Sequence, residues 1–292
     1  MVGWPERRFL DLAGCEHPIV QAPMAAAGGV ELCVSVIKGG GLGSLPCGLL
    51  TPDQVRAQVS NVRSRAKGPL NLNFFCHEMP ANADDRGWRA LLQPYCDEYD
   101  VEPGTGGALR LPFDADMCAV IEEVRPEVVS FHFGLPEIRL LERVKATGAT
   151  LVGNATTVEE ARWLEAGGVH AIIAQGFEAG GHIGRFLGSD PAEAMGLFAL
   201  LPQVVDATTV PVIAAGGIAD GRGIAAALIG RVFRVLASRG VRELTTEIDV
   251  TNAASRGLLE PLGAHVIGEH VEVVRRIDTW RASRSSGATA SD

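Results

Sequence analysis

Short apolar runs alternate with amphipathic helical patterns along most of this 292-residue chain, and this alternation constrains the fold more than any other feature. A repeated strand–helix order is typical of an α/β protein with a parallel sheet. The runs are nearly continuously apolar, as strands covered on both faces usually are. We expect seven strands, at residues 18–24, 40–45, 70–75, 127–134, 149–154, 169–176 and 211–217.

Two architectures fit this order, a doubly wound sheet and a TIM barrel. A doubly wound sheet that binds a nucleotide would carry the pattern GxGxxG after its first strand. Here the first expected strand ends in Ala22, Pro23 and Met24, and the glycines cluster after the sixth and seventh strands instead. Because the phosphate sites of TIM barrels commonly lie after strands 7 and 8, the sequence predicts a (β/α)8 barrel.

The helical and irregular segments define the expected domain limits. Residues 1–227 read as the barrel, and we expect helices to begin after the N-caps Thr51 and Thr157. The stretch 76–118 interrupts the rhythm after a strand, so we interpret it as an insertion that caps the substrate side. Residues 281–292 resemble a disordered tail.

Composition and charge exclude several partners. A net charge of −9 argues against nucleic acid and anionic membranes, since both require excess lysine and arginine. No apolar run reaches the roughly 20 residues that span a bilayer, and the N-terminus is charged where a signal peptide is apolar, so we expect a cytoplasmic protein. The six cysteines are scattered with no CxxC pair, which predicts buried free thiols and no metal site.

The run AQGFEAGGHIGR, residues 174–185, is the strongest candidate site. Gly180 and Gly181 could present backbone N–H groups to an anion or a flat ring without a Cβ in the way. His182 beside them could donate to or accept from a substrate near neutral pH, and Gln175 precedes them in the same run. A tight turn with a surface histidine would explain the same pattern.

Two other segments place small residues after expected strands. In PVIAAGGIADGRG, residues 211–223, a strand leads through Gly216 and Gly217 into a helix, which offers a phosphate cradle. A turn that needs glycine only for its backbone angles is the alternative. The small residues around Met24 leave room for a flat cofactor that its sulfur could cover, although close packing of helix on sheet would require them as well.

Two polar residues lie in apolar strands. Asn73 would be costly there without a partner, so it either binds a ligand or caps a loop. His132 follows the same logic, as a satisfied core residue or as a group that faces the same pocket as His182.

Together these segments resemble the nitronate monooxygenase family, formerly called 2-nitropropane dioxygenases. The matching segments are APM (22–24), GGLGSL (40–45), Asn73, RPEVVSFHFGLP (125–136), AQGFEAGGHIG (174–184) and VPVIAAGGIADG (210–221). The resemblance implies an FMN-dependent TIM barrel that oxidises alkyl nitronates, such as propionate 3-nitronate, with O2 to oxo compounds and nitrite. It implies that His182 is catalytic and that His132 lines the substrate pocket. Residues expected to bind FMN are Ala22, Pro23, Met24, Asn73, Gln175, Gly180, Gly181, Gly216 and Gly217.

After residue 227 the chain departs from this resemblance. Residues 228–280 are similar to the C-terminal part of a GNAT acetyltransferase, and the strand pattern at 241–250 could serve as an atypical eighth barrel strand. Its acidic residues would repel a phosphate, so we expect weakened FMN affinity. Two alternatives stay open: a reductase similar to FMN- and NAD(P)H-dependent enoyl-acyl-carrier-protein reductases, and an inactive, cofactor-poor fusion. Expected partners are a small nitronate and O2, with a homo-oligomer as an option.

Overall fold

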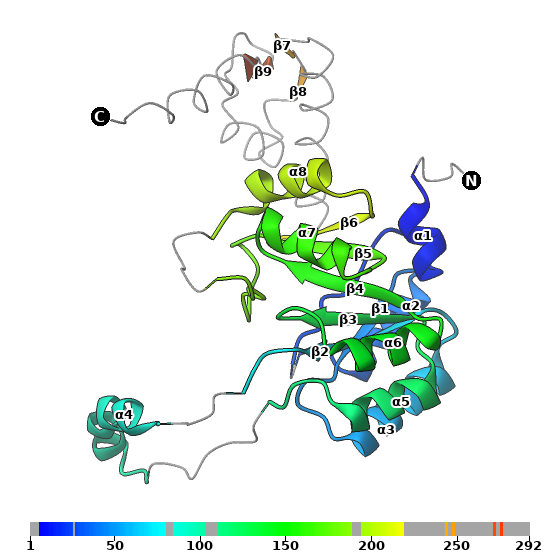
Figure 1. The fold of residues 1–292 in the computed structure, drawn as a ribbon. Coiled ribbons are helices and arrows are strands. Elements are labelled where there is room, and N and C mark those ends of the chain that lie inside the picture. The colour runs from blue at the N-terminus through cyan, green and yellow to red at the C-terminus, as the bar shows by residue number, and fades with distance from the viewer. Residues whose placement is uncertain are drawn as a thin grey trace. The chain divides into compact units, whose positions relative to one another are not determined.

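Six parallel strands run side by side in chain order in the computed structural model of the protein (Figure 1). They are β1 (Gly43–Pro46), β2 (Leu70–Phe75), β3 (Val128–His132), β4 (Thr150–Ala155), β5 (Ala171–Gln175) and β6 (Val212–Ala215). The helices are α1 (Arg8–Ala13), α2 (Val30–Lys38), α3 (Pro52–Arg65), α4 (Arg86–Tyr99), α5 (Ala115–Val124), α6 (Ile138–Ala146), α7 (Val158–Ala166) and α8 (Leu197–Ala207). Parallel neighbours joined by helices confirm the predicted α/β class.

The structure describes residues 6–25, 27–79, 84–102, 110–188 and 194–218, and the backbone of 243–244, 247–248, 271–272 and 275–276. The chain divides into two units, Met1–Ala215 and Gly216–Asp292.

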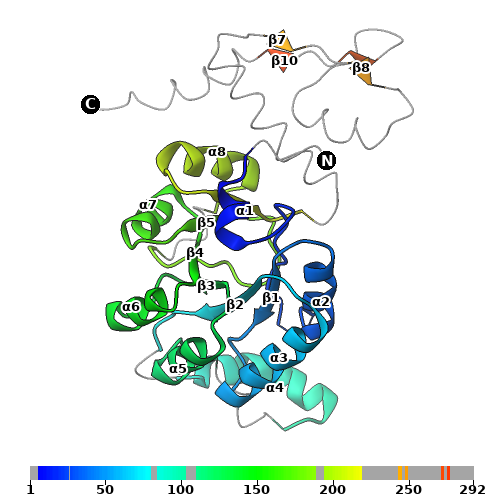
Figure 2. The ribbon, with the colours of Figure 1, turned by 90° about the vertical axis from the view of Figure 1, so that its right-hand side faces the viewer.

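The sheet of the first unit curls, and helices α2, α3, α5, α6, α7 and α8 form an arc around its outer face (Figure 2). This is the strand order and the curvature of a partly formed TIM barrel. Apolar residues on the outward side of the strands pack against these helices; Leu70 and Leu72 of β2 are fully buried. Full burial of one such side chain contributes roughly 1.5–3 kcal/mol to the free energy of unfolding. The packing of the helices on the sheet therefore forms most of the core.

Helix α1 covers the amino ends of the strands. Leu10 and Ala13 pack in one cluster with Leu42, Val128 and Ala171, which precede or begin β1, β3 and β5. The opposite, carboxyl ends of the strands are therefore left for a site.

The prediction of a strand over 18–24 is wrong in its length. In the structure this segment forms only one parallel bridge among the described residues, between Val20 and Leu42. Pro18 and Pro23 flank the bridge, and proline has no N–H to donate to a sheet ladder, so the pairing stops there. The other six expected strands are confirmed, and β2 coincides with the expected range 70–75.

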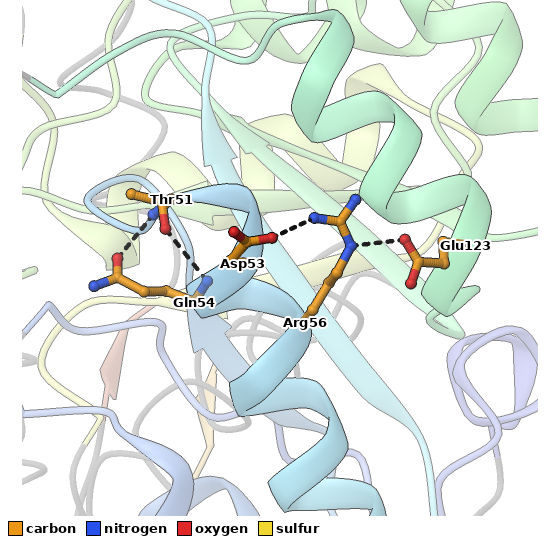
Figure 3. A network of polar contacts seen from close by, with 5 residues as sticks. All are labelled: Thr51, Asp53, Gln54, Arg56 and Glu123. Carbon is orange, nitrogen blue, oxygen red and sulfur yellow. Dashed lines mark hydrogen bonds and ion pairs between the residues drawn. The ribbon is translucent and has the colours of Figure 1, made fainter.

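Helix α3 begins directly after its N-cap Thr51, as predicted. Thr51 Oγ1 accepts from the backbone N–H of Gln54 (3.3 Å), and Gln54 Oε1 accepts from the N–H of Thr51 (2.9 Å), which forms a capping box (Figure 3). One turn later Arg56 lies between Asp53 (3.0 Å) and Glu123 (2.7 Å). Because Glu123 belongs to α5, this bridge joins two neighbouring helices of the arc.

The second unit contains four short described strands. They are β7 (Glu243–Leu244), β8 (Glu247–Ile248), β9 (Val271–Glu272) and β10 (Arg275–Arg276), and they pair antiparallel as β7 with β10 and β8 with β9. An eighth barrel strand would instead pair in parallel with its neighbours. The expected tail at 281–292 lies outside the described residues.

Helix α4 lies in the expected insertion and buries none of its residues. Trp88, Leu91, Tyr95 and Tyr99 of this helix are all more than half exposed. In the part of the chain that the structure describes, no helix is long and apolar enough to cross a bilayer.

All six cysteines carry free thiols, and Cys15, Cys33, Cys47 and Cys118 are buried. Burial raises the pKa of Cys33 to about 11 and that of Cys47 to about 12, so both resist conversion to the reactive thiolate. They act as small core residues.

Candidate active site

The carboxyl ends of β2 to β6 bring the predicted site segments to one edge of the sheet. The register pairs Phe75 at the end of β2 with His132 at the end of β3. It also pairs Gln175 with Ala215, the last residues of β5 and β6. Gly176 N donates to Ala215 O (2.8 Å), so the loops after β5 and β6 start at neighbouring strand ends.

A layer of buried amides and hydroxyls lines the inner face of the sheet. Asn71 Nδ2 donates to Ser44 Oγ (3.1 Å) and Ser130 Oγ (2.9 Å), and Asn73 Nδ2 also donates to Ser130 Oγ (2.9 Å). Ser44 N donates to Gln21 Oε1 (3.1 Å), which joins the segment after the Val20 bridge to this layer. Both asparagines alternate with the outward-facing leucines of β2, so they point away from the helices.

Gln175 fixes the loop that follows β5. Its Oε1 accepts from Asn154 Nδ2 (3.0 Å) and from Gly184 N (2.8 Å), and its Nε2 donates to His182 O (2.9 Å). One N–H of the amide is left for any cofactor. Gly184 must be glycine, because a Cβ there would lie 2.2 Å from Asn154 Nδ2 and 3.0 Å from His132 Cδ2.

A buried carboxylate holds the far end of the same loop. Glu160 of α7 is fully buried, and its Oε1 accepts from Phe186 N (2.6 Å) and Leu187 N (3.0 Å). Its Oε2 accepts from the N–H (2.7 Å) and the hydroxyl (2.8 Å) of Thr156. Four hydrogen bonds satisfy this charge, and with Gln175 they fix the chain on both sides of His182.

His182 lies in an aromatic surround, exposed to solvent. Its ring centroid is 5.4 Å from that of Phe75 and 6.0 Å from that of Phe133. Its Nε2 contacts Nη1 of Arg110. A guanidinium can only donate, so Nε2 accepts and the ring proton belongs on Nδ1. Partial burial, and then the charges of Arg110 and His77, lower the pKa of His182, so this imidazole is neutral near pH 7.

His132 lies deeper, at the end of β3. Burial, and secondarily the neighbouring His182, lower its pKa to about 4. Asn73 Nδ2 lies 3.5 Å from His132 Nδ1, so Nδ1 faces a donor and Nε2 carries the proton. Both predicted histidines therefore act as hydrogen-bonding groups and not as cations.

Arg110 is placed by the segment that returns from the insertion. Phe113 N donates to Phe75 O (2.7 Å), and the Phe113 ring packs against Phe74 (5.0 Å) and Phe131 (5.4 Å). Asp114 then caps α5 by accepting from Met117 N (2.9 Å). These contacts anchor the chain three residues after Arg110.

Phe133 has an unusual backbone. Its φ is +64°, in the left-handed region that side chains rarely adopt. The ring contacts those of Phe75 (5.4 Å) and His77 (6.1 Å) as well as His182. Such strain concentrates at functional sites, which agrees with the position of this residue at the strand end.

The structure brings Asn73, His132, Gln175 and His182 together in the first unit. Ala22 and Met24 are exposed after the bridge at Val20, and Pro23 is half-buried. Gly180 and Gly181 are exposed, with open space where a Cβ would be, and Gly181 has a φ of +79°. Gly216 (φ +122°) and Gly217 (φ +67°) directly follow β6 and belong to the second unit.

Sequence reasoning missed Asn71, Gln21, Asn154, Glu160 and Arg110. The two-residue spacing of Asn71 and Asn73 within LNLNFF could have revealed the first, because it places both on one face. Arg110 carried no local signal; it follows the glycine-rich stretch GTGGAL.

The polar layer fits one edge of a flavin ring. Gln21 Nε2, Asn71 Oδ1 and Asn154 Oδ1 are buried without a hydrogen-bond partner. The pyrimidine edge of a flavin offers one N–H donor and two carbonyl acceptors. One orphaned asparagine oxygen can accept from that N–H, and Gln21 Nε2 and the remaining N–H of Gln175 can donate to the two carbonyls. A cavity of about 10 Å³ beside Gln175 holds at most one water, so this cavity is too small for the ring.

A wider cavity of about 420 Å³ lies elsewhere, at the amino ends of β2 and β3, where Arg63, Lys67 and Glu127 line it. His182 lies at the other, carboxyl end of the strands, so this cavity is not part of the candidate active site.

The curled parallel sheet and the site at its carboxyl edge define a barrel enzyme. The chain matches the family model for nitronate monooxygenases over residues 6–261, and it belongs to that family. The match passes residue 227, so the expected end of the resemblance was placed too early. Membership implies a flavin cofactor; the acetyltransferase-like character of 228–280 stays a prediction.

Relatives agree with this assignment. The nitronate monooxygenase of Paraburkholderia phytofirmans is 41% identical over 251 residues, 84% of this chain and 68% of the relative. That of Pseudomonas aeruginosa is 40% identical over 76% of this chain and 64% of the relative. A solved nitroalkane oxidase of Streptomyces ansochromogenes superimposes with a TM-score of 0.69 at 38% identity, covering 76% of this chain and 64% of that one. The chain thus spans about two thirds of these proteins.

Proposed function

We propose that this chain oxidises alkyl nitronates of the propionate 3-nitronate type with O2, to oxo compounds and nitrite, and that its flavin is FMN. Family membership supports the reaction class. The observation that carries the proposal is the position of His182: a neutral imidazole, held from both sides, at the strand edge where unpaired buried amides fit a flavin. Bound FMN would supply the redox centre between nitronate and O2.

We assign binding of FMN to the residues identified from the sequence. The orphaned atoms of Gln21, Asn71 and Asn154 support a ring position next to them. The full set is Ala22, Pro23, Met24, Asn73, Gln175, Gly180, Gly181, Gly216 and Gly217, to which Gln21, Asn71 and Asn154 are added.

His182 is proposed as the catalytic residue. With Nε2 accepting from Arg110, its Nδ1–H can donate to a nitronate oxygen and orient the anion. His132 is proposed to line the substrate pocket, where its Nε2–H is a second donor. Phe75 and Phe133 exclude water from one side of His182, which strengthens these hydrogen bonds.

The visible spectrum of the purified protein tests this proposal. We expect flavin absorbance that bleaches anaerobically on adding propionate 3-nitronate and returns with O2, with release of nitrite. Succinate, which has the carboxylates but no nitronate, is the control and must leave the flavin oxidised. Rapid bleaching by NADH with none by the nitronate would favour the reductase, and a colourless protein that takes up no added FMN would favour the inactive fusion.

The domain limits are proposed as predicted: a barrel over 1–227 with the substrate-side insertion 76–118, and an acetyltransferase-like segment over 228–280. The antiparallel pairing of β7 with β10 and of β8 with β9 supports a segment whose strands pair with one another. Weakened FMN affinity, a cytoplasmic location and a homo-oligomeric state stay predictions.

A further inference from the structure

One guanidinium borders the neutral histidines of the site. Arg110 is exposed, and it pairs with no carboxylate of the described residues; its hydrogen-bond partner is His182. The other titratable groups near this ring are His77 and His132. A guanidinium stays charged in proteins, so Arg110 provides the fixed positive charge of this cluster.

The geometry separates Arg110 from the reacting end of the site. His132 and Asn73 lie at the strand ends, whereas Arg110 comes from the insertion, is exposed and contacts the exposed His182. One of its five N–H donors faces His182, which leaves four for a ligand. A planar guanidinium binds a carboxylate through two parallel hydrogen bonds, which a neutral alkyl chain cannot form.

We propose that Arg110 binds a second anionic group on the substrate, a carboxylate, and so makes the site selective for carboxylate-bearing nitronates over simple alkyl nitronates. This inference rests on the proposed function. His182 holds the nitronate group, and Arg110 holds the remote carboxylate. Arg110 is then a specificity-determining residue as well as the donor to His182 Nε2.

Kinetics with two matched substrates test the proposal. Propionate 3-nitronate and propyl 1-nitronate have the same chain length and differ in the carboxylate. In Arg110→Gln, whose amide can still donate to His182 Nε2, we expect kcat/KM for propionate 3-nitronate to fall about 10- to 100-fold further than kcat/KM for propyl 1-nitronate, mainly through KM. Arg110→Lys should recover part of the lost kcat/KM, because lysine keeps the positive charge but cannot form the two parallel hydrogen bonds of a guanidinium.

A control and a salt series sharpen the test. Arg89 of α4 is an exposed arginine of the same insertion that pairs with Asp85, so Arg89→Gln should change neither substrate's kinetics. Added salt should raise KM more for propionate 3-nitronate, which carries two negative charges, than for propyl 1-nitronate, which carries one, and this difference should shrink in Arg110→Gln. Equal losses for both nitronates in Arg110→Gln, or no loss for either, would overturn the proposal.

Binding separates this proposal from the function on which it rests. If the unaltered protein oxidises neither nitronate, the proposed function fails. Calorimetric titration with 3-nitropropionate and with 1-nitropropane still measures carboxylate recognition. Binding of 3-nitropropionate that is lost in Arg110→Gln supports the inference, and equal binding of both compounds, or none of either, overturns it.

Discussion

Replacing Glu160 by glutamine should destabilise the protein by about 3 kcal/mol. The substitution keeps the shape of the side chain but turns one acceptor oxygen into an NH2 group. If this group faces Thr156, whose hydroxyl can rotate to accept, the N–H of Thr156 loses its partner. An orphaned buried N–H costs about 1–3 kcal/mol. The bonds from Phe186 and Leu187 also lose their charge assistance, which roughly halves their strength.

Denaturant unfolding at a fixed FMN concentration measures this effect, since bound cofactor itself stabilises the native state. Glu159→Gln is the matched control, because Glu159 is an exposed neighbour in the first turn of the same helix. Glu160→Gln should also lower kcat/KM, because the loop that carries His182 loses its far anchor. A free energy of unfolding within about 0.5 kcal/mol of the Glu159→Gln value would refute the anchoring argument.

Three further predictions follow from the site and its scaffold. His182→Asn should lower turnover about 100-fold or more while the fold persists, because the loop is held through the backbone oxygen of His182; unchanged turnover removes the ring from the mechanism. Since the pKa of His132 is lowered to about 4, its neutral form stabilises the protein above pH 6.5, and up to about 3 kcal/mol is lost as pH falls from 6.5 toward 4. His132→Gln should flatten this part of the pH profile of unfolding, and parallel profiles would contradict it. Thr51→Ala should lower the free energy of unfolding by about 1 kcal/mol in the same assay, by removing the cap of α3; no change would show that water replaces the cap.

The sequence correctly predicted those elements that depend on residues close to one another in the chain. The caps at Thr51 and Thr157 depend on side chains within three residues, and both form as expected. The strand β2 is apolar on its outer face and bounded by turns, so its limits could be read from the sequence. The strand at 18–24 failed because the two prolines in it limit pairing more than its apolar character favours it.

The parts of the site that escaped prediction depend on contacts distant in sequence. Arg110 and His182 are 72 residues apart, and the anchoring of Phe113 on β2, together with the hold of Gln175 on the His182 loop, brings them together. Glu160 reads as an ordinary acid in the first turn of a helix, yet it is buried because the loop at 186–187 folds over it. No spacing rule within one element reports such contacts.

The left-handed backbone of Phe133 has a consequence for engineering. A residue with a Cβ in this conformation is disfavoured by roughly 1–2 kcal/mol, a cost that glycine avoids. Phe133→Gly would relax the main chain and at the same time open one wall beside His182 to water. The lost contacts of the ring with Phe75 and His77 oppose this gain, so a library designed for durability should leave this position fixed.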